Sequence, residues 1–171
     1  ISGNKAIDIA EKIFISKKGN KLNELKQRYL YYGHIVNEHN KVLDEVLITY
    51  MKKPYTYTKE DVVEINCHGG IISSKKILEL ILNNGCRLAE RGEFTKRAFL
   101  NGRIDLTQAE AVMDIISSKT DISHDISINQ LEGRLSIEIN KLINEIIQLI
   151  ANIEVNIDFP EYDEELITID Q

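Results

Sequence analysis

The stretch that decides the fold is RGEFTKRAFLNGRIDLTQAE, residues 91–110. Its first half predicts a short helix over Glu93–Leu100, with an apolar face made of Phe94, Ala98 and Phe99. The pair Asn101-Gly102 should end that helix, because glycine closes a helix in the left-handed conformation without a Cβ clash. A second helix is expected to begin at Asp105 or Thr107, since Thr107 and Glu110 have the spacing of a capping box.

Arg103 lies on the joint between these two predicted helices, and Arg91, Lys96 and Arg97 are close to it in the sequence. Cations at this spacing are usually a solvated helix face. The alternative is that the four side chains converge on one anion. The pattern leaves both interpretations open.

The chain ahead of this stretch alternates between helical and strand patterns. In chain order we expect a helix over Asn4–Phe14, strands over Arg28–Val36 and Val42–Met51 forming a hairpin, a helical turn at Thr58–Asp61, a strand over Val62–Cys67, a helix over Ile72–Asn83 and a strand over Cys86–Ala89. The last three elements would make a βαβ-like unit. The sequence therefore predicts an α+β fold, a mixed β-sheet with flanking helices.

After Arg103 the sequence pattern becomes helical throughout, with few helix-breaking residues. From Thr107 to Asp158 it holds no proline and one glycine, Gly133. Apolar residues recur at intervals of three and four between Ile128 and Ile153, which predicts one or two long helices. Phe159-Pro160 should end the last helix. These helices would expose apolar surface and so look like part of an incomplete helical domain.

Composition narrows the function classes. The net charge of −6 argues against broad nonspecific nucleic-acid binding, so any RNA contact would need a local basic patch. Two cysteines are too few for a disulfide framework, and we find no signal peptide or membrane span, so a cytoplasmic protein without a membrane partner is expected. The chain begins without methionine, which suggests a piece of a longer protein.

Two sites before residue 91 carry candidate chemistry. Glu64 lies in an apolar strand, where a carboxylate either faces solvent or accepts hydrogen bonds from a ligand with paired donors. His68-Gly69-Gly70 precedes a predicted helix and forms either a plain chain reversal or a ligand-facing turn. Cys67 beside His68 is interpreted as a core thiol, because one Cys and one His make a poor metal site, and no catalytic or metal site is expected.

Three motifs resemble those of the bacterial and organellar tRNA-modification GTPases known as the MnmE or TrmE family. They are residues 91–111, Asp61–Gly70 (DVVEINCHGG) and Ile157–Glu161 (IDFPE), and the opening Ile1-Ser2-Gly3 also matches. The resemblance implies an N-terminal folate-binding and dimerisation domain over residues 1–103, with a fold like the tetrahydrofolate-binding domain of glycine-cleavage T-protein. It also implies the first part of a helical domain over residues 104–171.

The same resemblance implies a function. In this family Glu64 and Arg103 match folate-contacting positions, and the cofactor is a tetrahydrofolate derivative, 5-formyl- or 5,10-methylene-tetrahydrofolate. The family protein is a homodimer that works with the FAD-dependent partner MnmG to modify C5 of the wobble uridine of certain tRNAs. Its GTPase domain, absent from this sequence, uses GTP, Mg²⁺ and K⁺.

Two alternatives belong to other classes. One is a stand-alone folate-dependent methyltransferase-like domain, against which the unfinished long helix and the IDFPE match argue. The other is a structural dimerisation module without a ligand, against which the retained Glu64 and Arg103 argue.

The sequence contains no G-x-x-x-x-G-K-[ST] motif, which is the loop that holds nucleotide phosphates in P-loop GTPases. We therefore expect this 171-residue chain to hydrolyse no GTP. Phosphate release above a buffer blank, persisting through a further purification step, would contradict this expectation.

Overall fold

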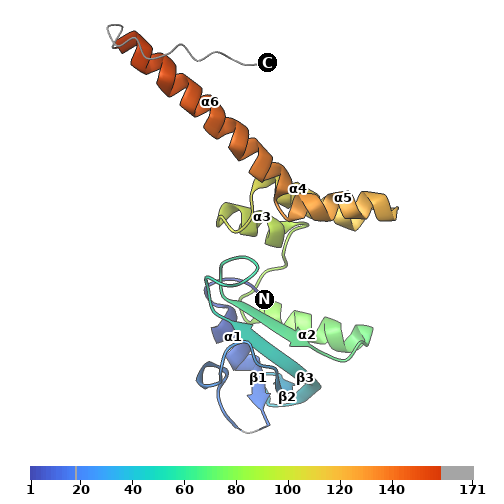
Figure 1. The fold of residues 1–171 in the computed structure, drawn as a ribbon. Coiled ribbons are helices and arrows are strands. Elements are labelled where there is room, and N and C mark those ends of the chain that lie inside the picture. Colours follow the sequence, from blue (N-terminus) through green and yellow to red (C-terminus); the bar gives the residue numbers. More distant parts are fainter. Residues whose placement is uncertain (18, 159–171) are drawn as a thin grey trace. The chain divides into compact units, whose positions relative to one another are not determined.

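The computed structural model describes residues 1–17 and 19–158 of the chain. They belong to two compact units, Ile1–Asp105 and Leu106–Gln171. Figure 1 colours the first unit blue to yellow-green and the second yellow to red.

The first unit is a four-stranded antiparallel sheet with helices packed on it. Its elements are α1 (Ala6–Ile13), β1 (Phe14–Ser16), a 3₁₀ turn (Leu22–Glu24), β2 (Tyr31–Val36), β3 (Val42–Met51), β4 (Val62–Asn66), α2 (Ile71–Asn83) and α3 (Glu93–Leu100). The strand order is β1-β2-β3-β4, so each strand pairs with its neighbour in sequence. Helix α1 packs against β4 and α2, and α2 packs against β3.

The core forms where the two-residue period of the strands meets the helical period of α1 and α2. The side chains of Ile48 and Val63 point toward the helices. Those of the next residues along the strands, Thr49 and Glu64, lie on the opposite face of the sheet. The core cluster consists of Ala6, Ile7, Ala10, Ile13, Phe14, Leu22, Ile35, Val46, Ile48, Tyr50, Val63, Ile77 and Leu80. Each large aliphatic side chain buried there stabilises the fold by about 1.5–3 kcal/mol.

Gly33 fixes how closely β1 approaches β2. A Cβ at this position would lie 2.3 Å from the carbonyl oxygen of Ile15 and 2.5 Å from the ring of Phe14. The backbone and a core ring therefore occupy the space that any side chain would need.

The α+β class predicted from the sequence is confirmed, and so are the hairpin and the helices α1, α2 and α3. The strand expected over Cys86–Ala89 is wrong, and no βαβ-like unit forms among the described residues. The reason is local: the Cys86 N–H bonds back to the Ile81 carbonyl at 3.4 Å, and Arg87 is held by an ion pair to Glu93 at the start of α3. This segment is therefore tied to helices rather than to the sheet.

The helical turn expected at Thr58–Asp61 is also wrong, because the segment forms non-helical turns. The Thr56 hydroxyl donates to the Glu60 carbonyl at 2.6 Å, and the Thr58 hydroxyl pairs with that of Ser2 at 2.7 Å. Side-chain hydrogen bonds of this kind compete with helix formation.

Up to residue 158, where its description ends, the second unit contains three helices, α4 (Leu106–Ser117), α5 (Asp121–Leu131) and α6 (Arg134–Asp158). The apolar period across residues 128–153 is thus divided between α5 and α6. Gly133, with φ of +84°, makes the break. Helix α4 begins at Leu106, directly after Asp105, which was one of the two expected starts. Thr107, the other, is the second residue of α4, and its hydroxyl pairs with that of Ser136 at 2.9 Å. The predicted stop at Phe159-Pro160 lies outside the described residues.

Helix α6 has no buried residue among its 25 positions. Its large exposed apolar side chains are Leu135, Ile137, Ile139, Leu142, Ile143, Ile146, Ile147, Leu149, Ile150, Ile153, Val155 and Ile157. A surface of this size is typical of helices that pack against a partner.

We expect the 171-residue chain to self-associate through α6, because burying this surface removes apolar area from water. Light scattering should give a mass above 19.6 kDa, and the double substitution Ile146→Glu and Ile153→Glu should lower it. The same mass in wild type and double variant would show that association occurs elsewhere.

Candidate functional site

Glu64 lies on β4 directly opposite Thr49 of β3. Its neighbours Val63 and Ile65 pack in or against the core, so strand alternation turns the Glu64 side chain to the other face of the sheet, where it is exposed. A carboxylate on a paired strand is held in a fixed position yet keeps its two oxygens for a ligand. The position suits an acceptor of two parallel hydrogen bonds.

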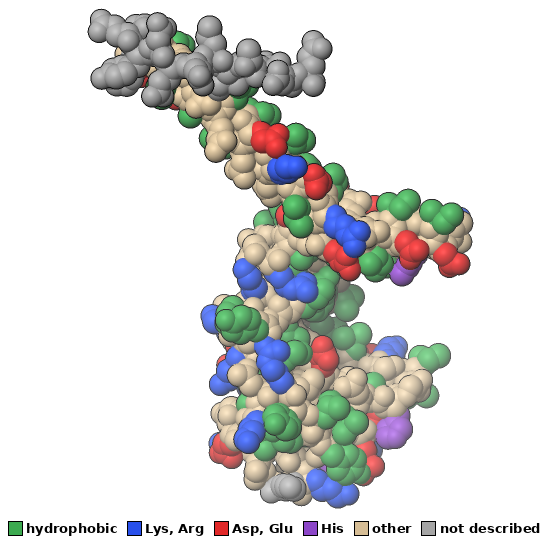
Figure 2. Space-filling view, in the orientation of Figure 1, with side chains coloured by type: hydrophobic (Ala, Val, Ile, Leu, Met, Phe, Trp, Pro, Cys, Tyr) green, Lys and Arg blue, Asp and Glu red, His purple; other side chains and the backbone are tan. Residues whose placement is uncertain are grey.

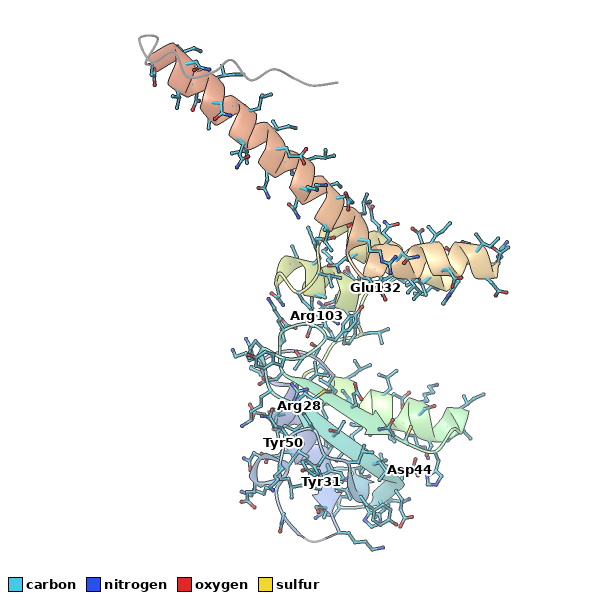
Figure 3. The ribbon with its side chains drawn as sticks, in the orientation of Figure 1. Arg28, Tyr31, Asp44, Tyr50, Arg103 and Glu132 are labelled. Atoms are coloured by element: carbon cyan, nitrogen blue, oxygen red, sulfur yellow. The ribbon has the colours of Figure 1, made fainter. Side chains whose placement is uncertain are left out.

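Arg103 lies just after α3, on a joint that other residues fix. Its guanidinium lies over the ring of Tyr57, 4.6 Å from the ring centroid, and its backbone N–H donates to the Ala98 carbonyl at 2.8 Å. Gly102 before it has φ of +67°, as expected for the glycine that ends the helix. Figure 3 labels Arg103 at this joint.

The loop that carries Tyr57 is tied to the same joint. Lys59 Nζ donates to the Gly102 carbonyl at 2.8 Å, and Asn101 Nδ2 donates to the Thr58 carbonyl at 2.6 Å. The Tyr57 hydroxyl pairs with Thr95 Oγ1 at 3.1 Å. Stacking on Tyr57 covers one face of the guanidinium and leaves its N–H edge for an anion or a carbonyl oxygen.

Glu93, at the start of α3, is the buried charge of this region, with an exposed fraction of 8%. Its carboxylate accepts from Arg87 Nη1 at 2.8 Å, from Arg97 Nη2 at 2.5 Å and from the Glu90 backbone N–H at 2.8 Å. Arg97 also donates to Glu60 at 2.9 Å. We call Arg87, Glu93, Arg97 and Glu60 the Glu93 cluster.

The cluster bears on one open question and on one expectation. Of the two interpretations of the four cations, convergence on one anion is not supported, because Arg97 pairs with two carboxylates and Arg103 lies on Tyr57. The apolar face expected on α3 is also only partly correct: Ala98 is buried, but Phe94 and Phe99 are exposed and Glu93 is buried instead.

Hydrogen bonds from Arg87 lower the pKa of the Glu93 carboxyl to about 2, from an ordinary 4.5, and the Glu90 N–H and Arg97 add to the effect. Because the pKa is lower in the folded state, ionised Glu93 stabilises the fold above pH 4.5. That contribution is lost as the pH falls toward 2.

The turn His68-Gly69-Gly70 connects β4 to α2 and is anchored from β3. Asp44 accepts from the His68 backbone N–H at 3.0 Å and contacts His68 Nδ1 at 2.7 Å. Burial alone would raise the pKa of Asp44, but the hydrogen bonds from His68 and Ser73 bring it below its usual value. A Cβ on Gly69 or Gly70 would meet no atom within 4 Å, so the turn is open to its surroundings. Figure 3 labels Asp44 at this end of the sheet.

A cavity of about 500 Å³ lies elsewhere in the first unit, and the sequence patterns do not indicate it. Its walls come from the opening segment with α1, from the last turns of α2, and from residues 85–97. Ile9, Ile81, Leu82, Leu88 and Phe94 give it a mainly apolar lining, and Arg97 of the Glu93 cluster lies at its wall. Neither Glu64 nor Arg103 lines this cavity.

Within residues 1–17 and 19–158, no three His, Cys, Asp or Glu side chains group so that they could hold a metal ion. Cys67 and Cys86 are both free, and Cys67 packs against the core cluster as expected for a core thiol. No helix in the described part of the chain is long and apolar enough to cross a membrane.

Comparison with known proteins accounts for both units. Residues 1–103 match the family model described as GTP-binding protein TrmE N-terminus, and residues 106–171 match the model described as MnmE helical domain. The chain belongs to the MnmE family. The resemblance noted on the motifs is thereby confirmed.

Curated relatives named tRNA modification GTPase MnmE match nearly the whole chain. That of Clostridioides difficile is 60% identical over 168 residues, covering 98% of this chain and 36% of the relative. That of Alkaliphilus metalliredigens is 57% identical over 171 residues, 99% of this chain and 37% of the relative. That of Bacillus subtilis is 53% identical over 165 residues, covering 96% of this chain and 36% of the relative. The chain thus spans little more than a third of the length of these MnmE proteins.

The Glu93 cluster gives a prediction on pH and stability. Glu93→Gln should lower the melting temperature at neutral pH, because the amide carries no negative charge and one acceptor oxygen becomes an NH2 donor, which leaves both guanidinium groups under-compensated. The difference from wild type should be largest above pH 4.5 and shrink as the pH falls toward 2. Glu79→Gln, which alters an exposed pair with Lys75, is the control and should change little at any pH. A difference for Glu93→Gln that is independent of pH would contradict this account.

Proposed function

We propose that this chain is the folate-binding and dimerisation part of a tRNA-modifying GTPase, together with the start of its helical domain. The observation that carries the proposal is the match of residues 1–103 and 106–171 to two successive domains of the MnmE family. Residues 1–103 provide the ligand site and the dimer contact, and the enzyme acts in the cytoplasm. The activity is the modification of C5 of wobble uridine in certain tRNAs, carried out with the FAD-dependent partner MnmG.

The one-carbon donor in this proposal is 5-formyl- or 5,10-methylene-tetrahydrofolate. Glu64 accepts the amino group and the adjacent ring N–H of the pterin, because a carboxylate presents two acceptors side by side. Arg103 meets a carboxylate or a ring oxygen of the same ligand through its N–H edge. Its stacking on Tyr57 supports this role, since the ring restricts the guanidinium to one orientation. The open turn at His68, Gly69 and Gly70 is a further proposed contact.

The hydrolysis of GTP, with Mg²⁺ and K⁺, belongs in this proposal to the part of the enzyme outside the present sequence. In this proposal the residues of this chain bind and orient the folate, and its sequence has no P-loop motif to hold nucleotide phosphates. A structural dimerisation module and a stand-alone folate-dependent methyltransferase are the competing functions. Failure of the full-length protein to bind 5-formyltetrahydrofolate would favour the first, and folate-dependent methyl transfer without GTP the second.

Titration calorimetry of the full-length protein with 5-formyltetrahydrofolate tests the site. Glu64→Gln should weaken binding by roughly ten- to a hundred-fold, because an acceptor becomes a donor and loses a charge-assisted bond worth about 1.5–3 kcal/mol. Arg103→Ala should weaken it more than Arg103→Lys, which keeps the charge but loses the planar fork.

Glu79→Gln, on the exposed surface of α2, is the matched control for Glu64→Gln and should bind like wild type. Wild-type affinity in both Glu64→Gln and Arg103→Ala would mean that the ligand binds elsewhere, with the cavity of about 500 Å³ as the next place to test.

A further inference from the structure

Two exposed stretches of the first unit, residues 26–30 and 52–55, combine cations with large planar or apolar side chains. They read KQRYL and KKPY and hold four of the 21 Lys and Arg residues but none of the 27 Asp and Glu residues. All nine residues are exposed. Within the two stretches this reverses the sign of a chain whose net charge is −6, and the acidic group that contacts them is Asp61, whose Oδ1 accepts from the Lys53 N–H at 2.9 Å.

The two stretches lie side by side because backbone and side-chain hydrogen bonds join them. The Lys52 N–H donates to Gln27 Oε1 at 3.1 Å, and the Arg28 guanidinium donates to the Tyr55 carbonyl. The Arg28 N–H donates to the carbonyl of Tyr50, a core residue of β3, at 2.9 Å. The surface is therefore anchored to the sheet, although it is built from loops.

The two tyrosine side chains on this surface are largely exposed to solvent and are not packed into the protein. Tyr55 is 81% exposed and Tyr29 is 57% exposed. Unlike Tyr57, whose ring carries the guanidinium of Arg103, neither ring has a cation or another aromatic ring against it in the described structure. Figure 2 shows Lys and Arg side chains along the left margin of the first unit, among hydrophobic side chains.

We propose that Lys26, Arg28, Tyr29, Lys52, Lys53 and Tyr55 form a contact surface for the unpaired loop nucleotides of an RNA. The cations meet phosphates, and the tyrosine rings stack on splayed bases, which is how proteins hold single-stranded nucleic acid. The inference rests on the proposed function, for which it supplies the RNA surface of this chain. It is independent of Glu64 and Arg103.

The chemistry favours RNA over an anionic membrane. Proteins that bind membrane surfaces usually insert the apolar face of an amphipathic helix, rich in Leu, Phe or Trp. This surface is made of loops, and Leu30 is its only large aliphatic side chain. Rings with a polar tip, flanked by cations, suit stacked bases better than acyl chains.

The test measures fluorescence anisotropy of a labelled RNA hairpin with an unpaired loop, and of a blunt RNA duplex, on the full-length protein. Tyr55→Ala should weaken binding of the hairpin about fivefold or more and leave the duplex unchanged, because only unpaired bases stack. Tyr55→Phe keeps the ring and should bind like wild type.

The lysines are tested by a matched pair of double variants. Lys52→Ala with Lys53→Ala should weaken both RNAs and reduce the slope of log affinity against log salt by about 1.4, roughly 0.7 for each lost phosphate contact. Lys75→Ala with Lys76→Ala, an identical exposed dipeptide on α2, should leave affinity and slope unchanged.

Four results would overturn the surface. The first is equal affinity in the two double variants, and the second is wild-type protein that binds no hairpin. The third is that the variants lose binding to phosphatidylserine vesicles but keep wild-type RNA binding, which would assign the surface to membranes. The fourth is a changed mass in light scattering, which would assign it to protein association. Titration with 5-formyltetrahydrofolate is run on the same variants: unchanged folate affinity keeps the proposed function even where the RNA surface fails.

Discussion

The buried carboxylate of Glu93 is the interaction on which the candidate site depends. Burying an ionised group is costly unless hydrogen bonds and opposite charges offset the loss of water, and Glu93 has two guanidinium groups and a backbone N–H for this purpose. Arg97 then extends the cluster to Glu60, and Glu60 accepts from the Ser2 hydroxyl at 3.2 Å. One charge thus connects the opening segment, the loop before β4 and helix α3.

The position of Arg103 follows from this cluster. Helix α3 is only eight residues long, too short to be stable by itself, so its orientation comes from contacts made by its side chains. Glu93 and Arg97 hold its first turns from one side, while Asn101 holds its end to the loop at Thr58. Arg103 comes directly after that end. A change at Glu93 would therefore displace Arg103 and disturb the proposed ligand site without removing either of the residues proposed to contact the ligand, Glu64 and Arg103.

Sequence patterns predicted the parts of the fold that depend on local periodicity. Strand β3 has the predicted bounds Val42–Met51, and α3 has the predicted bounds Glu93–Leu100. The failures occur where polar contacts outside the regular secondary structure decide the conformation. Residues 86–89 have the apolar alternation of a strand, yet Arg87 joins them to α3, and the spacing of Arg87 and Glu93 gives no sign of that contact. The stacking of Arg103 on Tyr57, 46 residues away, had no sequence signal either. The i, i+4 spacing of Glu93 and Arg97 was a usable signal for a helix-surface pair, but it could not indicate burial.

Five cations of the first unit lie in three different environments, and the environment limits which partners each cation can bind. Arg87 and Arg97 are committed to carboxylates, so they hold the structure together and have little charge left for a ligand. Arg103 has an aromatic ring on one face and forms no salt bridge with an acidic residue in the described part of the chain, which suits a single directed contact. The side chains of Lys52 and Lys53 are exposed at the start of the loop between β3 and β4, which suits the screened, nonspecific attraction of a polyanion, while the acidic Glu60 and Asp61 lie at the end of that loop. The carboxylates of Glu93 and Glu60 pair with Arg87 and Arg97 and not with Arg103, so a chain with a net negative charge still has a cation at this joint for the proposed anion contact.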